Sequence, residues 1–190
     1  MSIYVSQVKI AAVDPAYFQC AKNSPIGQPI WSNTQPSVAL THIFCGQISR
    51  GKAEGYHSRP DNRDPVCARA NNKVQYGTYP LNCYKKIEVR QYFNGFRDKW
   101  IRRDPGTYCF FPSTWSICNT VTVLRKIYNG CQRAGSRDSD KICVQNYNKE
   151  GFGIVIFIKI DENGNEGIGS AFPVTKSMYK SMPCKKYCCV

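Results

Sequence analysis

The sequence has no long apolar segment, no internal repeat and no low-complexity block. None of its apolar runs approaches the roughly 18 residues that a membrane-spanning helix needs, so we expect no membrane span. Residues 1–13 also lack the continuous apolar region of a secretory signal peptide. A chain of 190 residues with these absences fits one domain with short extensions.

Acidic residues are scarce in this chain. Asp and Glu number 13 against 26 Lys and Arg, which gives a formal net charge of +13. A domain this basic attracts polyanions, and binding that neutralises phosphates depends on salt. Nucleic acid is therefore the favoured partner. The alternative is a cationic protein whose charge serves only solubility or surface binding.

The CxxC pattern is missing as well: none of the 11 cysteines forms it, and the closest cysteines are Cys184, Cys188 and Cys189. Structural zinc sites usually need two such short ligand pairs, so we expect no zinc site. The cysteines extend from Cys20 to Cys189, which favours a disulfide framework and a secreted or exported, oxidising location. The odd total predicts at least one thiol that is free or paired between chains.

Composition divides the chain into three parts. Residues 1–37 mix short apolar runs with Asn, Pro, Ser and Gln, and we interpret them as an N-terminal extension. Residues 38–175 have the patterns of a folded domain. Residues 176–190 are rich in Lys and Cys and are interpreted as a tail held by disulfides.

One helix is predicted in the middle of the folded unit, after Ser113 and Thr114. The Asn129-Gly130 pair, which tolerates positive φ, is predicted to end it. Its apolar residues recur at helical spacing: Ile117, Val121, Leu124 and Tyr128.

A β-hairpin is predicted near the end of the folded unit. Residues 153–160 and 168–174 are apolar and β-rich, and the polar turn between them contains Asn-Gly. Residues 87–93 predict another strand, 58–75 a loop, and 38–43 either a buried strand or a helix end. Strands and a helix without βαβ alternation predict an α+β fold with antiparallel sheet.

The chain has only two histidines, His42 and His57. RNA cleavage by transphosphorylation needs a base for the 2′-hydroxyl proton and an acid for the departing 5′-oxygen, and histidine suits both roles. The reaction also needs a cation near the phosphate. A basic protein with two histidines can supply these groups without a metal. The alternative is that both are ordinary solvated or core residues.

The residues around the histidines resemble motifs of the EndoU family of endoribonucleases, particularly its bacterial toxin branch. Residues 42–46 (HIFCG) and 55–58 (GYHS) resemble the two histidine elements of that family. Residues 100–116, which contain CFFPSTWS, resemble its W-x-x-K…T-F-F-P-x-x-W-S segment, and 170–173 (SAFP) resemble its S-A-Y-P. The four elements stand in the same order, and the resemblance covers about 38–175.

The resemblance implies catalytic roles for His42 and His57. The position of the family's catalytic lysine falls on Arg103, with Lys99 and Arg102 nearby. Arginine can neutralise phosphate charge and donate two hydrogen bonds, but it cannot exchange a proton near neutral pH. Arg103 is therefore expected to stabilise the phosphate, and Lys99 to bind substrate.

Two further family positions are altered. The threonine before F-F-P falls on Cys109, with Thr107 close by, and the base-contacting tyrosine falls on Phe172. Phenylalanine keeps a stacking face and loses the hydroxyl. Substrate contacts are thus expected from Thr107, Cys109, Ser170 and Phe172.

As a whole, the resemblance implies an α+β fold of the EndoU and RNase A kind, with two small antiparallel sheets flanking a cleft. It implies an endoribonuclease that cleaves single-stranded RNA to 2′,3′-cyclic phosphate and 5′-hydroxyl ends. We expect no cofactor and no metal, since no carboxylate cluster forms a metal cage. The partners implied are RNA and an acidic inhibitor (immunity) protein that would meet the basic surface.

Two alternatives remain open at this point. An EndoU-fold protein that has lost catalysis would bind RNA tightly and salt-sensitively without cutting it. A disulfide-rich cationic protein would instead bind lipid or cell surfaces independently of the histidines. No basic amphipathic helix in the sequence supports the second alternative.

Overall fold

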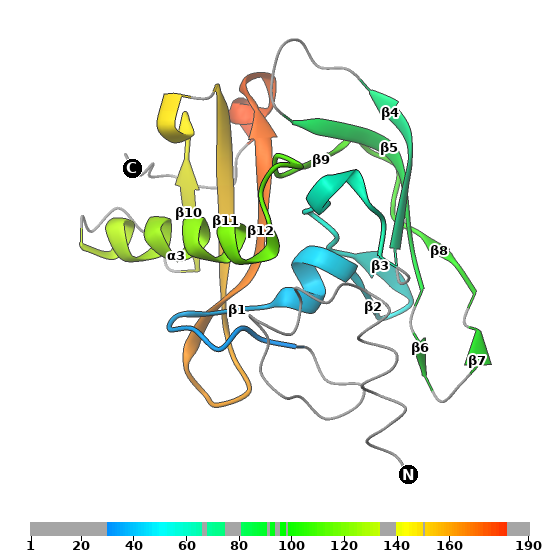
Figure 1. The fold of residues 1–190 in the computed structure, drawn as a ribbon, viewed down its shortest axis with the longest axis horizontal. Helices are drawn as coiled ribbons and strands as arrows, with labels where there is room; N and C mark the ends of the chain where they lie inside the picture. The colour runs from blue at the N-terminus through cyan, green and yellow to red at the C-terminus, as the bar shows by residue number, and fades with distance from the viewer. Residues whose placement is uncertain are drawn as a thin grey trace.

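The computed structural model describes residues 30–65, 68–74, 81–90, 92–93, 96–97, 99–133, 140–149 and 151–181. Within them, two four-stranded sheets lie in separate halves of the molecule, and helix α3 (Ile117–Arg133) packs against one of them (Figure 1). The expected α+β class is therefore confirmed. The finer likeness to RNase A stays a prediction.

The first sheet has the strand order β1-β12-β11-β10 and is antiparallel except for β1, which runs parallel to β12. Its strands are β1 (Ser37–Val38), β10 (Lys141–Val144), β11 (Phe152–Ile160) and β12 (Glu166–Thr175). The predicted hairpin is β11–β12 and is confirmed. In its turn, the Asp161 carboxylate accepts hydrogen bonds from the backbone N–H groups of Asn163 and Asn165, and Gly164 has a φ of +80°.

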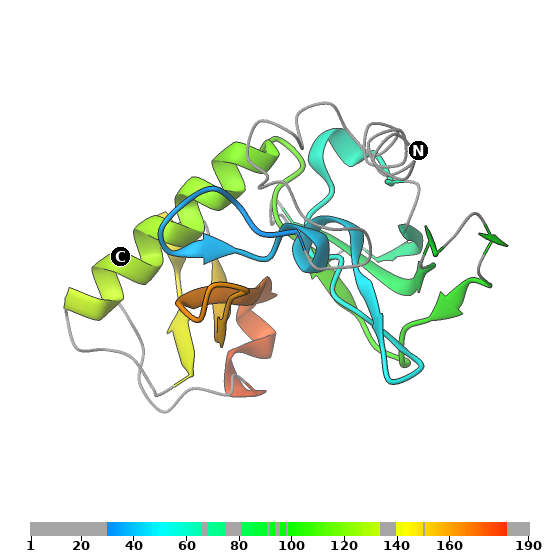
Figure 2. The same cartoon turned by 90° about the horizontal axis from the view of Figure 1, so that it is seen from below.

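Helix α3 covers one face of this sheet, as Figure 2 shows from below. Its buried row comprises Ile117, Val121, Leu124 and Ile127, which pack on the alternate residues of β11 and β12 that face it. Ser116 caps the helix start, since its hydroxyl accepts a hydrogen bond from the Asn119 N–H. The predicted end at Asn129-Gly130 is wrong. The helix continues to Arg133 because Cys131, in the next turn, is fully buried and disulfide-bonded.

The second sheet is centred on β5 (Asn82–Val89), which pairs along its length with β4 (Ala68–Val74), β8 (Ile101–Arg102) and β9 (Tyr108–Phe110). All of these pairings are antiparallel. The prediction of a loop over 58–75 is therefore wrong for Ala68–Val74. The strand was hidden by its composition, because only two alanines, Ala68 and Ala70, form its buried row.

Two small hairpins complete the described strands. One is β2 (Gln47–Ser49) with β3 (Lys52–Glu54), and the other is β6 (Tyr92–Phe93) with β7 (Phe96–Arg97). The predicted strand 87–93 is thus divided, with β5 ending at Val89 and β6 pairing elsewhere. Residues 38–43 begin as the end of β1 and pass into a short π-helix, η1 (Thr41–Cys45), so both alternatives apply in succession.

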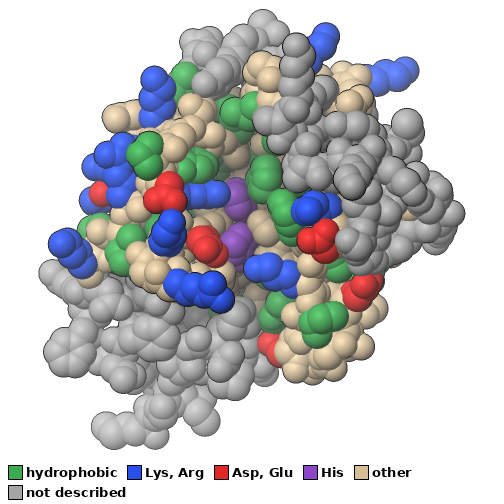
Figure 3. Space-filling view, turned by 180° about the vertical axis from the view of Figure 1, so that it is seen from behind, with side chains coloured by type: hydrophobic (Ala, Val, Ile, Leu, Met, Phe, Trp, Pro, Cys, Tyr) green, Lys and Arg blue, Asp and Glu red, His purple; other side chains and the backbone are tan. Residues whose placement is uncertain are grey.

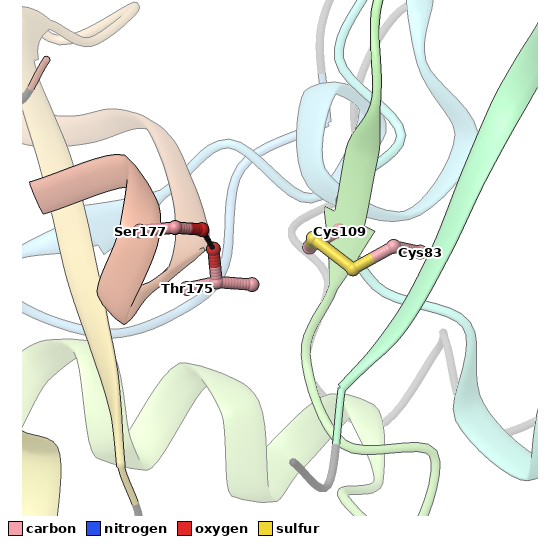
Figure 4. Close-up of a disulfide and its surroundings, with 4 residues drawn as sticks. All are labelled: Cys83, Cys109, Thr175 and Ser177. Carbon is pink, nitrogen blue, oxygen red and sulfur yellow. Dashed lines mark hydrogen bonds between the residues drawn. A yellow bond between two sulfur atoms is a disulfide. The ribbon is translucent and has the colours of Figure 1, made fainter. Parts of the chain in front are cut away.

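Disulfides hold several elements, as the cysteine pattern predicts. Cys83 on β5 is bonded to Cys109 on β9, and Figure 4 shows this bond facing the end of β12, where the hydroxyls of Thr175 and Ser177 lie 2.8 Å apart. Strand β9 contacts β12, so this bond lies where the two halves meet. Cys118, Cys131 and Cys143 are disulfide-bonded as well.

The chain just before and just after the predicted 38–175 unit packs on it. Trp31 is buried and forms a β-bridge with Ala39, and the Ser37 hydroxyl donates to Asp161 over 2.7 Å. After β12, a 3-10 helix, η4 (Lys176–Ser181), continues the chain. The division into extension, domain and tail stays a prediction. Among the described residues, no helix combines the length and apolarity needed to cross a membrane.

Candidate active site

The two histidines are brought together by direct hydrogen bonds between their chain segments. His42 lies on η1 and His57 follows β3. The Tyr56 N–H donates to the His42 carbonyl over 2.7 Å, and the His57 N–H donates to the Ile43 carbonyl over 2.6 Å. The imidazole centroids are consequently 5.6 Å apart, with the ring planes at 39°. The Phe111 N–H donates to the His57 carbonyl over 2.9 Å and so holds the His57 segment on its other side.

Two glycines make this approach possible. Gly55 has a φ of +75°, and a Cβ atom built on it would overlap the carbonyl oxygen of His42. Gly46 has a φ of +70°, and a Cβ there would lie 2.9 Å from the carbonyl oxygen of Glu54 and 2.9 Å from a methyl carbon of Val89. Both positions need the missing side chain and the left-handed backbone, which only glycine combines readily. The glycines of the two histidine motifs are therefore packing requirements.

Both imidazoles are in the neutral form at neutral pH in this protein. Burial is the main cause, since His42 is 7% and His57 4% exposed. It lowers the pKa of His42 from 6.5 to about 4, with the positive charges of Lys159 and Arg103 acting in the same direction. Burial also holds the pKa of His57 well below 6.5, assisted by the charges of Arg103 and His42. In the free protein at neutral pH, neither ring therefore carries the additional proton of an imidazolium.

Arg103 follows β8 in a half-buried position, close enough to both histidines for its charge to act on each of them. Its Nη1 donates to the Gly55 carbonyl over 2.8 Å, and its guanidinium carbon is 4.1 Å from the Tyr108 ring centroid. Burial lowers the pKa of Arg103 from its high ordinary value, and the nearby oxygens of Tyr108 and Glu54 oppose this change. The group is a fixed cation whose remaining N–H donors are available for an anion.

Phe172 reaches the histidine pair from the first sheet. Its ring centroid is 5.2 Å from that of His57 and 6.1 Å from that of Phe157, on which it stacks. Ser170 lies two residues earlier on β12, opposite Phe157, so its side chain projects from the same face of the strand. Both residues are half-buried. The structure therefore places Ser170 and Phe172 on the sheet face that adjoins His57.

The other predicted substrate contacts are placed less directly. Lys99 is exposed and precedes β8, and Thr107 is half-buried just before β9. The sulfur of Cys109 is bonded to Cys83, and the residue is 5% exposed. A disulfide sulfur offers substrate no hydrogen-bond donor, so Cys109 cannot replace a threonine hydroxyl.

Lys159 was not anticipated from the sequence and acts on the site through its charge, which lowers the pKa of His42. It lies near the end of β11 and is exposed. The only sequence signal was a single cation in an otherwise apolar strand. Among the described residues, no three His, Cys, Asp or Glu side chains come close enough together to hold a metal ion.

The histidines lie in a hollow between the two halves of the molecule. In the space-filling view of Figure 3 their purple side chains are recessed between two raised lobes, with Lys and Arg side chains and some acidic ones around them. Two close, uncharged imidazoles beside fixed cations form a site suited to proton transfer at an anionic substrate.

This fold and site define an α+β protein that holds two imidazoles close together in a groove between its halves. The family model described as "Bacterial EndoU nuclease" matches residues 36–175, and the chain belongs to that family. The matched segment contains both histidines, Arg103 and the whole β11–β12 hairpin. No curated protein and no solved structure matches the chain significantly. Membership in a nuclease family supports endoribonuclease activity in general.

Proposed function

We propose that this protein cleaves single-stranded RNA by transphosphorylation, with His42 and His57 as the acid–base pair. The observation that carries the proposal is the distance of 5.6 Å between the two imidazole centroids in one recessed site, with the charge of Arg103 acting on both. This spacing suits two groups that act on opposite oxygens of one phosphate. Membership in the Bacterial EndoU nuclease family supports RNA as the substrate.

In the proposed reaction, one imidazole accepts the proton of the ribose 2′-hydroxyl while that oxygen attacks the adjacent phosphorus. The bond from phosphorus to the 5′-oxygen breaks, and the second imidazole, as imidazolium, donates a proton to that oxygen. The products are a 2′,3′-cyclic phosphate and a 5′-hydroxyl. Arg103 stabilises the negative charge that builds on the phosphate oxygens.

The lowered pKa values fit this scheme only if substrate changes them. A phosphate bound beside the rings adds negative charge, which favours the imidazolium form and raises the pKa of the nearer histidine. Binding then delivers the proton that the acid needs. The free protein keeps both rings neutral and the bound substrate charges one of them, so proton uptake accompanies substrate binding.

Phe172 provides a flat apolar face beside His57 on which a nucleobase can stack. Without the tyrosine hydroxyl expected from the family pattern, the base would be held by stacking more than by hydrogen bonding. Ser170, on the same face, offers a hydroxyl to the same nucleotide. Base selectivity is therefore weaker than in relatives with tyrosine.

Two further proposals follow from the sequence and from family membership. The protein acts outside the producing cell, in an oxidising setting that suits its disulfides. An acidic inhibitor protein covers the basic groove in that cell. A pull-down from the source organism that recovers no acidic protein would argue against the inhibitor.

The experiment is cleavage of a labelled single-stranded RNA at low salt in EDTA, beside the same oligonucleotide with 2′-deoxyriboses throughout. We expect cuts in the RNA alone, since the nucleophile is the 2′-oxygen. Cleavage of the deoxy strand would contradict transphosphorylation. Salt-sensitive binding of intact RNA, also after manganese is added, would favour the RNA-binding alternative.

A further inference from the structure

We propose that Lys159 binds the RNA phosphate in the histidine groove, and that Gly169 lacks a side chain so that the Lys159 chain can lie across it. The inference rests on the proposed function and adds a phosphate-binding residue to the same site. The family pattern does not assign this position a role. The argument rests on the face of β11 that carries Lys159, the path of its chain and the charges around it.

Strand alternation places Lys159 on the face that adjoins the histidines. Ile158 is buried in the core that α3 covers, so its neighbours Phe157 and Lys159 project from the opposite face of β11. Phe157 stacks on Phe172, and Phe172 contacts His57. Lys159 therefore lies on the site face of the hairpin, one step beyond Phe157.

The path of the Lys159 chain is fixed by the packing at Gly169. The β11–β12 register shifts between Phe157 and Ile158, because Ser170 pairs with Phe157 and Ile168 with Ile158, which leaves Gly169 as the extra residue. A Cβ built on Gly169 would lie 2.5 Å from both Cγ and Cδ of Lys159 and 2.7 Å from its Cβ. The aliphatic part of Lys159 thus crosses β12 over bare backbone.

That path leads toward the segment that carries His42. On the far side of β12 lies β1, whose chain continues into η1, and the Ala39 N–H donates to the Ile168 carbonyl over 2.9 Å. In agreement, after burial the positive charge of Lys159 is the largest cause of the lowered pKa of His42, ahead of that of Arg103. The ammonium thus acts on the site from the first sheet.

Arg103 and Lys159 then face the histidines from opposite halves of the molecule, one following β8 and one on β11. Within the described part of the chain, no carboxylate forms an ion pair with Lys159. Two cations beside two neutral imidazoles attract an anion, and an RNA phosphate is the anion that fits this site. The family's catalytic lysine position holds Arg103 in this chain. Lys159 therefore supplies the site with an ammonium group from another position.

The test compares Lys159→Gln with Lys126→Gln, which removes the same charge from the exposed side of α3. We expect Lys159→Gln to lower kcat/KM for single-stranded RNA by about 100-fold, the lower end of what removal of one transition-state donor costs. Lys126→Gln should stay within about twofold of the wild type, since its charge lies outside the groove. Lys159→Arg should recover part of the loss.

Gly169→Ala tests the path of the chain. In the wild type the added methyl displaces Lys159, and kcat/KM should fall as in Lys159→Ala. In the Lys159→Gly background, where Cβ, Cγ and Cδ are all gone, Gly169→Ala should add little further loss, so the two effects are not additive. Thermal unfolding of each variant separates loss of fold from loss of the contact.

Binding of a 2′-O-methyl RNA, which cannot be cleaved, separates the Lys159 proposal from the proposed nuclease function. If the wild type cleaves RNA and Lys159→Gln cleaves and binds as well as the wild type, the Lys159 proposal is wrong while the proposed function stands. If the wild type does not cleave, the proposed function fails. Weaker binding of the 2′-O-methyl RNA by Lys159→Gln than by Lys126→Gln would then still support the phosphate contact, and equal binding would overturn it.

Discussion

Gly55 lies so close to His42 that a Cβ atom at position 55 would overlap the His42 carbonyl oxygen. That contact brings the two histidine segments together, with the Tyr56 N–H bonded to the same carbonyl over 2.7 Å. The geometry of the proposed acid–base pair thus depends on a residue without a side chain.

Gly55→Ala should lower the free energy of unfolding by more than about 2 kcal/mol, because strain at positive φ adds to a backbone overlap. Gly51→Ala is the matched control. Gly51 has nearly the same φ, +76°, but a Cβ there meets nothing within 4 Å, so only the conformational cost of about 1 kcal/mol is expected. Urea unfolding of both variants measures the difference. Equal losses would show that the contact with His42 is unimportant.

Acid should destabilise the protein through its histidines. In the unfolded chain they take up protons near pH 6.5, whereas His42 in the folded protein does so only near pH 4, and the pKa of His57 is lowered too. The unfolded state binds more protons between these values, so the free energy of unfolding falls as pH drops from about 6.5 toward 4 and is constant above that window. In His42→Asn the free energy of unfolding should fall less steeply over this window, as urea midpoints at several pH values would show. An unchanged slope would contradict the burial effect.

The Arg103 side chain should matter for its charge. Arg103→Gln removes the cation beside both histidines and should lower kcat roughly 100-fold, whereas Arg103→Lys restores the residue expected from the family pattern and should keep most of the activity. Arg102→Gln removes a neighbouring exposed charge and serves as the control. Single-turnover cleavage rates distinguish the three variants. If Arg103→Gln and Arg102→Gln behave alike, Arg103 has no role at the phosphate.

Phe172 should determine how the base is held. Phe172→Ala removes the stacking face beside His57 and should weaken substrate binding by about 1–3 kcal/mol, chiefly through KM. Phe172→Tyr keeps the face, adds a hydroxyl and should sharpen the preference among the four bases. Cleavage of RNAs that differ in one base reports both effects. A KM unaffected by Phe172→Ala would remove the residue from the binding site.

Strongly local signals made part of this fold predictable. The β11–β12 hairpin follows from its apolar runs and Asn-Gly turn, and the start of α3 from the spacing of Ile117, Val121 and Leu124. Strand β4 was missed because its buried row is only Ala68 and Ala70, and a short alternation of small residues resembles a loop. The end of α3 was misplaced because tertiary burial of Cys131 overrides the Asn129-Gly130 signal.

In the site, too, residues marked by local motifs could be predicted, and residues placed by tertiary contacts could not. His42 and His57 are close in sequence and share one motif pair, so their meeting was predictable, and Arg103 could be located by its distance from Trp100. Lys159 could not, since its approach depends on the bulge that places Gly169 beneath it. The loss of Cys109 as a hydrogen-bonding residue depends on its pairing with Cys83, which spacing does not reveal.

The central claim is that His42 and His57 together cut RNA, and the most direct measurement is the product ends left by the wild type, His42→Asn and His57→Asn in EDTA. We predict 2′,3′-cyclic phosphate and 5′-hydroxyl ends from the wild type, and a loss of rate of at least about 100-fold in each variant. Full activity in either variant, or 5′-phosphate ends from the wild type, would contradict the two-histidine mechanism.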